Sequence, residues 1–146
     1  MTIISGCVRK PNRGNSETEP IPKRYEAVSA VQLIWEPFPD EPDEYFLNFI
    51  NVRLLNPTSS AIRFQGYSSI SPWYRIQRWI DGAWVEHRVG WFCGTGLDQF
   101  SIPSDRSSVI PVDVTDDLFP IRVGVEYSND RKVKADMVVW SEKIDH

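Results

Sequence analysis

The amino-acid sequence predicts an all-β fold, a single sandwich of about seven to eight antiparallel strands, and three observations predict it. Apolar and polar residues alternate with a period of two in several stretches, most clearly in 121–127, which is the pattern of a half-buried strand. Turn-forming residues separate many of these stretches at roughly the 8–12-residue spacing typical of sandwiches. No stretch from residue 27 onward has convincing helical periodicity, so a parallel sheet built from alternating strands and helices is not expected.

The composition is that of one globular domain with a core. The chain has 146 residues, of which 41% are hydrophobic and 25% are charged, as in folded domains rather than disordered chains. The formal net charge of −4 argues against a nucleic-acid surface, which normally needs a basic patch. No apolar run approaches the roughly 18 residues that a membrane-spanning helix needs.

Strands are expected first in 28–35, 45–55 and 61–67. The first stretch is apolar and rich in Val and Ile. A loop of prolines and acidic residues follows it: Pro37, Pro39, Asp40, Glu41, Pro42, Asp43 and Glu44. In 45–55, apolar Ile50, Val52 and Leu54 alternate with polar residues, and the Asn-Pro-Thr-Ser-Ser sequence of 56–60 is a turn signal.

Residues 73–88 carry the clearest hairpin signal. Asp81-Gly82 separates two alternating stretches, and Asp-Gly favours a type I′ turn because both central positions need positive φ. A two-residue loop then sets the pairing as Ile80 with Ala83, Trp79 with Trp84, Gln77 with Glu86, and Arg75 with Arg88. The expected inner face, interrupted by Arg78 and His87, consists of Tyr74, Ile76, Ile80, Ala83, Val85 and Val89. The expected outer face consists of Trp73, Arg75, Gln77, Trp79, Trp84, Glu86 and Arg88.

The C-terminal half predicts four further strands. After an irregular, glycine-rich stretch at 91–98, a short strand is expected in 100–103 and a longer one in 109–114. Pro111 cannot donate to a ladder, so the second of these is expected at an edge or at a bulge. A half-buried strand follows in 121–127, and 133–141 closes the domain with a central Met-Val-Val-Trp sequence that suggests burial on both faces.

This pattern of short strands and turns, from residue 27 to residue 144, is similar to that of bacterial immunoglobulin-like and fibronectin-III-like modules. The resemblance implies an immunoglobulin-like sandwich. The Cys-Trp-Cys arrangement of antibody domains is absent, because Cys93 has no partner cysteine within the domain. A jelly roll or a small barrel therefore stays open as the topology.

Four residues near the start, Ile4-Ser5-Gly6-Cys7, resemble the lipobox of bacterial lipoproteins: an aliphatic residue, two small residues and the cysteine that receives lipid. The resemblance implies that Cys7 is lipidated and that the protein is anchored in a bacterial cell envelope, with residues 1–7 as a signal remnant. It also requires a natural start other than Met1, or residues upstream, because no basic and apolar signal regions precede Ile4.

Residues 8–26 are expected to form a flexible tether ahead of a sandwich domain at 27–146. Within the tether, 9–24 contains three prolines, five basic residues and no apolar pattern, so it buries too little surface to offset its ordering entropy. If Cys7 is lipidated, Cys93 is a free thiol, whereas an unmodified Cys7 would allow a disulfide between them. If Met1 is the genuine start, the chain is instead a soluble cytoplasmic β-domain.

No pattern in the chain indicates an enzyme, a metal or a cofactor. The hydrolase elbow, the P-loop, the dinucleotide fingerprint and the H-E-x-x-H zinc motif are all missing. Gly94-Thr95-Gly96 is interpreted as a turn, His87 as a packed histidine opposite Ile76, and Cys93 as a packed thiol. The acidic residues at 40–44, and those at Asp113, Asp116 and Asp117, lack calcium-loop spacing and are interpreted as solvated.

The six tryptophans are the best functional lead. Trp35 and Trp140 lie in apolar stretches and are expected in the core, whereas Trp79 and Trp84 are expected to form a cross-strand pair among polar neighbours. Such a face can bind a partner's apolar side chains or a sugar ring. The sequence therefore predicts a non-enzymatic module that engages an unknown envelope protein, or alternatively a carbohydrate-binding module that uses the Trp79 and Trp84 face and possibly Trp73.

Overall fold

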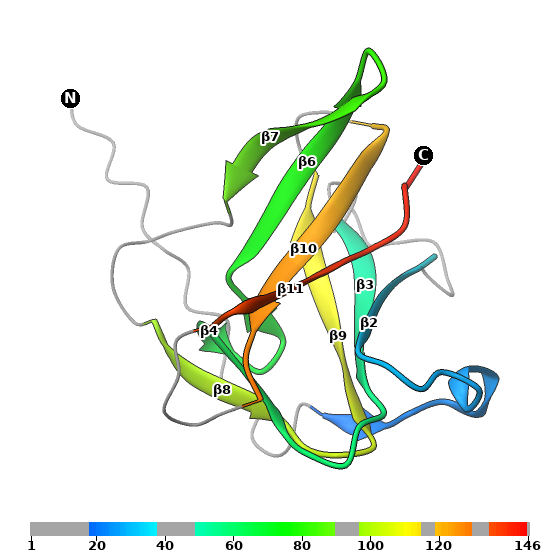
Figure 1. Ribbon diagram of the computed structural model, residues 1–146, viewed down its shortest axis with the longest axis vertical. Coiled ribbons are helices and arrows are strands. Elements are labelled where there is room, and N and C mark those ends of the chain that lie inside the picture. Colours follow the sequence, from blue (N-terminus) through cyan, green and yellow to red (C-terminus); the bar gives the residue numbers. More distant parts are fainter. Residues whose placement is uncertain (1–17, 38–48, 90–96, 115–118, 130–134, 146) are drawn as a thin grey trace.

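The computed structural model describes residues 18–37, 49–89, 97–114, 119–129 and 135–145, and its fold is all-β, as predicted (Figure 1). These residues form eleven strands and one short 3-10 helix, η1 (Lys23–Tyr25). The strands are β1 (Glu19–Pro20), β2 (Gln32–Glu36), β3 (Phe49–Asn56), β4 (Ile62–Ser68), β5 (Ser71–Pro72), β6 (Tyr74–Ile80), β7 (Ala83–Val89), β8 (Asp98–Ile102), β9 (Arg106–Asp113), β10 (Ile121–Tyr127) and β11 (Met137–Trp140).

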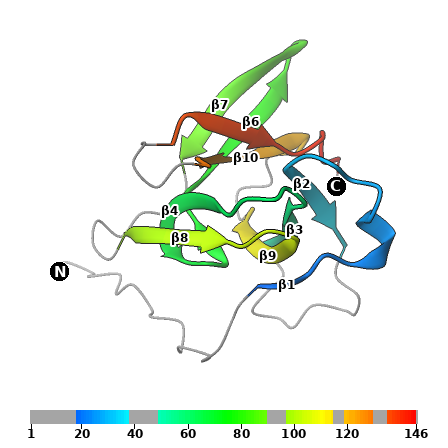
Figure 2. The same ribbon diagram turned by 60° about the horizontal axis from the view of Figure 1, so that its bottom comes forward.

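The strands form three antiparallel sheets. The first sheet has the order β1-β9-β3-β2, the second β11-β10-β6-β7 and the third β5-β4-β8. Arg63 and Ser128 exchange backbone hydrogen bonds of 2.8 Å, which join the third sheet to the second. The second sheet lies on the opposite side of the molecule from β1 in the turned view (Figure 2).

One hydrophobic core lies between the sheets. Alternate residues of strands from all three sheets point into it, as the period of a half-buried strand requires. Its fully buried members come from all three sheets: Val52, Leu54, Ile110, Val112, Ile76, Ile121, Val123, Ile62, Phe64 and Ile102. This packing of antiparallel sheets face to face is consistent with the predicted β-sandwich.

At Pro111, β9 is unpaired on one side, as the sequence predicted. Pro111 pairs with Asn51 of β3 on one side. On its other side β9 pairs with β1 only at Arg106 and Ser107. In the described part of the chain no strand lies on that side at Pro111, so its missing N–H leaves no gap in the ladder.

The Asp81-Gly82 turn has the predicted conformation. Both residues have positive φ, 49° at Asp81 and 82° at Gly82, and Trp79 pairs with Trp84. The pairing of Arg75 with Arg88 was wrong, because a bulge shifts the register between Ile76 and Gln77. Arg75 pairs with Val89, and Arg88 pairs with Ile76.

The inner face of the hairpin is buried over only part of its length. Tyr74 and Ile76 lie in the core, but Ala83 is exposed, and the exposed fractions of Ile80 and Val85 are 40% and 45%. The prediction that these three face the core was wrong because the β6–β7 hairpin extends beyond the opposing sheet (Figures 1 and 2). His87 is exposed for the same reason, so it is not the packed histidine that was predicted.

Two further burial predictions were wrong. Trp35 is 38% exposed, since β2 is the last strand of the first sheet. The β11 strand is at the edge of the second sheet, and its Val138 is 39% exposed, so it is not buried on both faces. Trp140 is half-buried, and it packs on arginines of the outer face of this sheet rather than in the core.

Residues 18–26, predicted to belong to the tether, lie against the first sheet, and we call them the strap. Glu19 and Pro20 pair with β9, and the guanidinium of Arg106 donates to the Thr18 carbonyl at 2.5 Å. Several other predictions fall outside the described residues: the lipobox with Cys7, residues 8–17, the acidic residues at 40–44, Cys93, the turn at 94–96, Asp116 and Asp117. Within the described ranges, no helix has the length and hydropathy needed to cross a bilayer.

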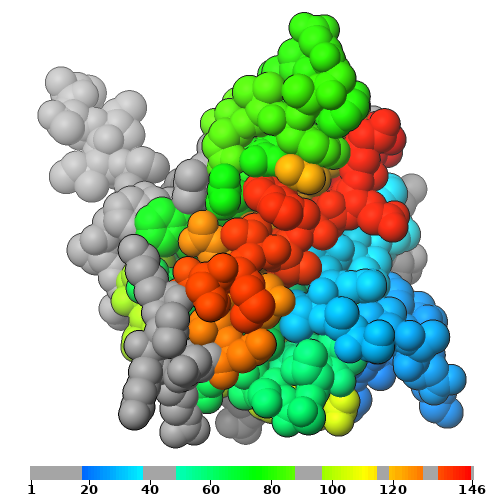
Figure 3. Space-filling view, viewed as in Figure 1, coloured from blue at the N-terminus to red at the C-terminus, as the bar shows by residue number. Residues whose placement is uncertain are grey.

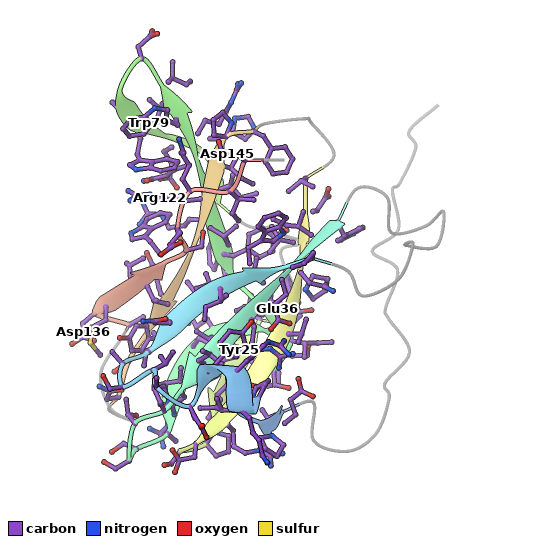
Figure 4. The ribbon with its side chains drawn as sticks, turned by 90° about the vertical axis from the view of Figure 1, so that its right-hand side faces the viewer. Tyr25, Glu36, Trp79, Arg122, Asp136 and Asp145 are labelled. Carbon is purple, nitrogen blue, oxygen red and sulfur yellow. The ribbon has the colours of Figure 1, made fainter. Side chains whose placement is uncertain are left out.

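A buried ionic cluster fixes the strap to β2 and β3. The guanidinium of Arg53, only 7% exposed, donates from Nε and Nη2 to the two carboxylate oxygens of Glu36, at 2.7 and 3.0 Å. It also donates to Glu19 and to the hydroxyl of Ser107. Tyr25 donates to Glu36 at 2.7 Å (Figure 4). Three strap residues, Glu19, Arg24 and Tyr25, therefore contact one largely buried Arg–Glu pair.

This cluster predicts a loss of stability in acid. Burial opposes ionisation of Glu36, but hydrogen bonds from Arg53, Tyr25 and Arg24 outweigh it and lower the pKa of Glu36 to about 2, against an ordinary 4.5. The stabilisation is therefore complete above pH 4.5 and is lost as the pH falls toward 2; it is at most about 3 kcal/mol. Urea titrations between pH 6 and pH 2 test this, and Glu36→Gln should flatten the dependence in that window. An equal slope in the two proteins would contradict the prediction.

Candidate binding face

The outer face of the second sheet gathers eight polar and aromatic side chains. We call these the tryptophan–arginine face: Arg75, Gln77 and Trp79 of β6, Trp84 and Glu86 of β7, Arg122 and Glu126 of β10, and Trp140 of β11. Alternation places them on one side of their strands, and the register places Gln77 opposite Arg122 and Gly124 opposite both Arg75 and Trp140. Figure 4 shows Trp79 and Arg122 on the same outer side of this sheet.

Aromatic rings and guanidinium groups alternate across the face. Trp79 and Trp84 meet edge to face, with ring centroids 5.0 Å apart and an interplanar angle of 65°, a favourable arrangement for two indoles. The Arg122 guanidinium carbon lies 4.6 Å from the ring centroid of Trp84 and 4.4 Å from that of Trp140. The guanidinium carbon of Arg75 lies 5.2 Å from the ring centroid of Trp140. These cation–π contacts hold the face in one arrangement.

A chain of hydrogen bonds runs beside the rings. Arg122 donates to the amide oxygen of Gln77 from Nε at 2.8 Å and from Nη2 at 2.6 Å. The amide nitrogen of Gln77 donates to Glu86 at 2.9 Å. Arg75 then binds both oxygens of Glu86, at 3.0 and 2.9 Å. The side chains of three strands are thereby fixed in position before any ligand arrives.

The charges on this face are unevenly balanced. The hydrogen bonds from Arg75 outweigh desolvation and lower the pKa of Glu86. Burial and the nearby Arg75 lower the pKa of Arg122, while Glu86 partly opposes them. Arg122 is thus a cation whose environment only partly compensates its charge.

Gly124 provides the space that Trp140 occupies. A Cβ atom at Gly124 would lie 2.6 Å from two ring carbons of Trp140, well inside van der Waals contact. The indole therefore lies directly on the backbone of β10, next to Arg122 on the same strand. Any larger residue at this position would force the ring to move.

Replacement of Gly124 with valine should displace Trp140 and remove one of the two rings that contact Arg122. We expect a loss of about 1–3 kcal/mol of stability, the usual cost of overpacking. The exciton couplet of the Trp79–Trp84 pair in the far-UV circular dichroism spectrum should persist, because that pair lies on the other side of Arg122. Trp79→Ala is the control that abolishes the couplet. An unchanged unfolding midpoint for Gly124→Val would contradict the close packing.

The structure brings together five of the seven face residues that the sequence predicted: Arg75, Gln77, Trp79, Trp84 and Glu86. Trp73 lies just before β6, outside the strand, and is 37% exposed. The bulge removes Arg88 from the position opposite Arg75. The sequence analysis did not include Arg122 and Trp140 in this face. The alternation in 121–127 does show which residues lie on the polar side of that strand, but it does not show which strands pair with it.

This face offers aromatic surface beside fixed hydrogen-bond donors and acceptors. Trp79 is 39% exposed, and the hairpin and β11 form one continuous part of the surface (Figure 3). Within the described ranges, no three His, Cys, Asp or Glu side chains are grouped so as to hold a metal ion. Aromatic residues and arginine are the types most enriched where proteins bind one another.

An open hollow beside the strap is another candidate site. It has a volume of about 590 Å³ and is lined by residues of the ionic cluster and their neighbours: Arg24, Tyr25, Trp35, Glu36, Pro37, Asn51, Arg53 and Val109. Its central carboxylate, Glu36, already accepts four hydrogen bonds from Arg24, Tyr25 and Arg53. The hollow therefore offers a ligand less free hydrogen-bonding capacity than the tryptophan–arginine face does.

The geometry of this face is the basis for any functional conclusion, because comparison with known proteins finds no match. No protein-family model, curated protein or solved structure matches the chain.

Proposed function

We propose that this chain is a non-enzymatic binding module that engages another protein through the tryptophan–arginine face, while lipid on Cys7 anchors it in a bacterial cell envelope. The observation that carries the proposal is the rigid, partly exposed array of Trp79, Trp84 and Arg122 on a hairpin that extends beyond the core. A surface whose side chains are already fixed loses little entropy on binding.

The way in which neighbouring side chains cover the indole rings favours a protein partner over a sugar. A sugar platform needs an open ring face, but Trp84 has Arg122 on its face and Trp79 against it. Trp79 is 39% exposed on the outer face of the hairpin, and apolar Ile80 and Val85 are exposed on its other face. Such a projecting apolar tip with a polar rim is suited to the groove or surface of another protein.

The position of the strap fits an anchor at the other end of the domain. The described chain begins at Thr18, next to β1, and β1 lies opposite the β6–β7 hairpin in both ribbon views (Figures 1 and 2). A lipid on Cys7 would hold the domain by its β1 end. The hairpin would then point away from the membrane, toward other envelope proteins.

Site-specific photo-cross-linking in the native cells tests the binding surface. A benzophenone amino acid at position 79 or 85 is expected to give a discrete protein adduct, while the same group at Gln99, exposed on β8 of the third sheet, should not. The Trp84→Ala variant should weaken the adduct at position 85. Identical adducts from positions 79 and 99 would contradict the proposal, and a saccharide adduct would favour the carbohydrate-binding alternative.

Intact-mass analysis of separated membrane and soluble fractions tests the anchor. A membrane-bound species that begins at Cys7 and carries a diacylglyceryl group is the expected result. A soluble species that begins at Met1 or Thr2 would refute the anchor while leaving the binding surface to the cross-linking test.

A further inference from the structure

Arg122 has a hydrogen-bonding edge that the protein does not use. A guanidinium group can form paired hydrogen bonds along its Nε–Nη2 side or along its Nη1–Nη2 end. Gln77 occupies the first of these with a single oxygen. In the described part of the chain, no oxygen accepts a hydrogen bond from Nη1 of Arg122. The end of the guanidinium is therefore available to an acceptor from outside.

Two indoles restrict how such an acceptor can approach. Trp84 and Trp140 belong to strands on opposite sides of β10, and both rings lie within 5 Å of the Arg122 guanidinium carbon. The two indoles cover the guanidinium carbon, so the unused Nη1–Nη2 end is the side left for an acceptor. An acceptor with two oxygens in the guanidinium plane, as in a carboxylate, matches that end.

The local charges favour a singly charged acceptor. Glu86 is bound by both nitrogens of the Arg75 fork, so its carboxylate only partly balances Arg122. Glu126 also lies on this face, 3.7 Å from Arg75. Two carboxylates nearby would repel a phosphate dianion more strongly than a single carboxylate, because Coulomb repulsion scales with charge.

From these observations we propose that the Nη1–Nη2 end of Arg122 binds a carboxylate of the protein partner, from an acidic side chain in an exposed segment. This rests on the proposed function and names the chemistry of the partner. The carboxylate would lie in the guanidinium plane, and apolar groups beside it would contact Trp79 at the hairpin edge. The partner is thus expected to present an acidic residue flanked by apolar ones.

The test uses the full chain and a defined probe, a capped Leu-Glu-Leu peptide that carries one carboxylate between apolar residues, at constant ionic strength. The readouts are the Nε–Hε resonance of Arg122 in a nitrogen-15 NMR spectrum and the fluorescence of the flanking tryptophans. Arg122→Gln should weaken binding about tenfold or more, as expected when a charge-assisted pair of hydrogen bonds is lost. The matched control is Arg78→Gln, which removes the same charge from the opposite side of β6 and should leave the affinity within about twofold.

A saturable shift with the Leu-Glu-Leu peptide, absent with capped Leu-Gln-Leu and lost in Arg122→Gln alone, would support the proposal. Equal losses in Arg122→Gln and Arg78→Gln would overturn it, because they would show attraction to net charge only. Tighter binding of inorganic phosphate than of the Leu-Glu-Leu peptide would also overturn it. If the peptide does not bind but a protein adduct still forms at position 79, only the carboxylate site is rejected and the binding surface stands. If the peptide binds but no protein adduct forms, the proposed function is rejected instead.

Discussion

Glu36→Ala is expected to lower the free energy of unfolding by about 3–5 kcal/mol, the usual result when one partner of a buried ion pair is removed. Arg53 would remain almost fully buried, with only Glu19 and the Ser107 hydroxyl as partners. Its charge would then lack the bidentate carboxylate that compensates desolvation. Urea denaturation at pH 7, followed by tryptophan fluorescence, measures the change.

Glu86→Ala is a matched control, because it breaks a second bidentate Arg–Glu pair that lies across neighbouring strands. The side chains of Arg75 and Glu86 are 30% and 38% exposed, against 8% and 13% for Arg53 and Glu36. An exposed pair contributes at most about 1 kcal/mol. Comparable losses from the two variants would refute the assigned role of burial.

Asn56→Ala is expected to cost about 3 kcal/mol, since leaving each buried polar group unsatisfied costs roughly 1–3 kcal/mol. The amide nitrogen of this fully buried residue donates to the carbonyls of Ser60, Ile102 and Pro103, at 2.8, 3.0 and 3.1 Å. Its oxygen accepts from the backbone and the hydroxyl of Thr58. One side chain thus joins the β3–β4 loop to the end of β8.

Hydrogen exchange separates this effect from a general loss of packing. The Thr58 amide should exchange faster in Asn56→Ala even under conditions where the core strands stay protected. Asn51→Ala is the control, because Asn51 is half-buried on the same strand and makes no side-chain hydrogen bond to another described residue. Equal destabilisation by the two substitutions would contradict the role of Asn56.

The local features of this fold could be predicted because they depend on neighbours in sequence. The Asp81-Gly82 turn, the alternation in β10 and the edge position at Pro111 all follow from backbone chemistry within a few residues. The burial of Ile80 and Val85 could not be predicted, because it depends on where the opposing sheet ends. Periodicity assigns a face to a strand but not the length over which that face is covered.

The candidate site shows the same division. The Trp79–Trp84 pair follows from a two-residue loop. Arg122, however, joins it through the pairing of β10 with β6, segments more than 40 residues apart, and Trp140 joins through the pairing of β11 with β10. Arg53 is similar: alternation suggests a solvated position, yet three carboxylate or hydroxyl partners from distant segments allow its burial. Which strands pair depends on the whole topology, and the local patterns of one sequence do not reveal it.

The strap also determines how the domain would respond to mechanical load. A pull on the chain ahead of Thr18 reaches β1 first, where two residue pairs and the side chains of Arg53 and Arg106 hold it, whereas β9 and β3 share eight residue pairs. The short β1 pairing would break before the long β9–β3 ladder. Residues 18–31 would then extend to roughly 45–50 Å, which lengthens the chain ahead of the sheets before the remaining strands separate.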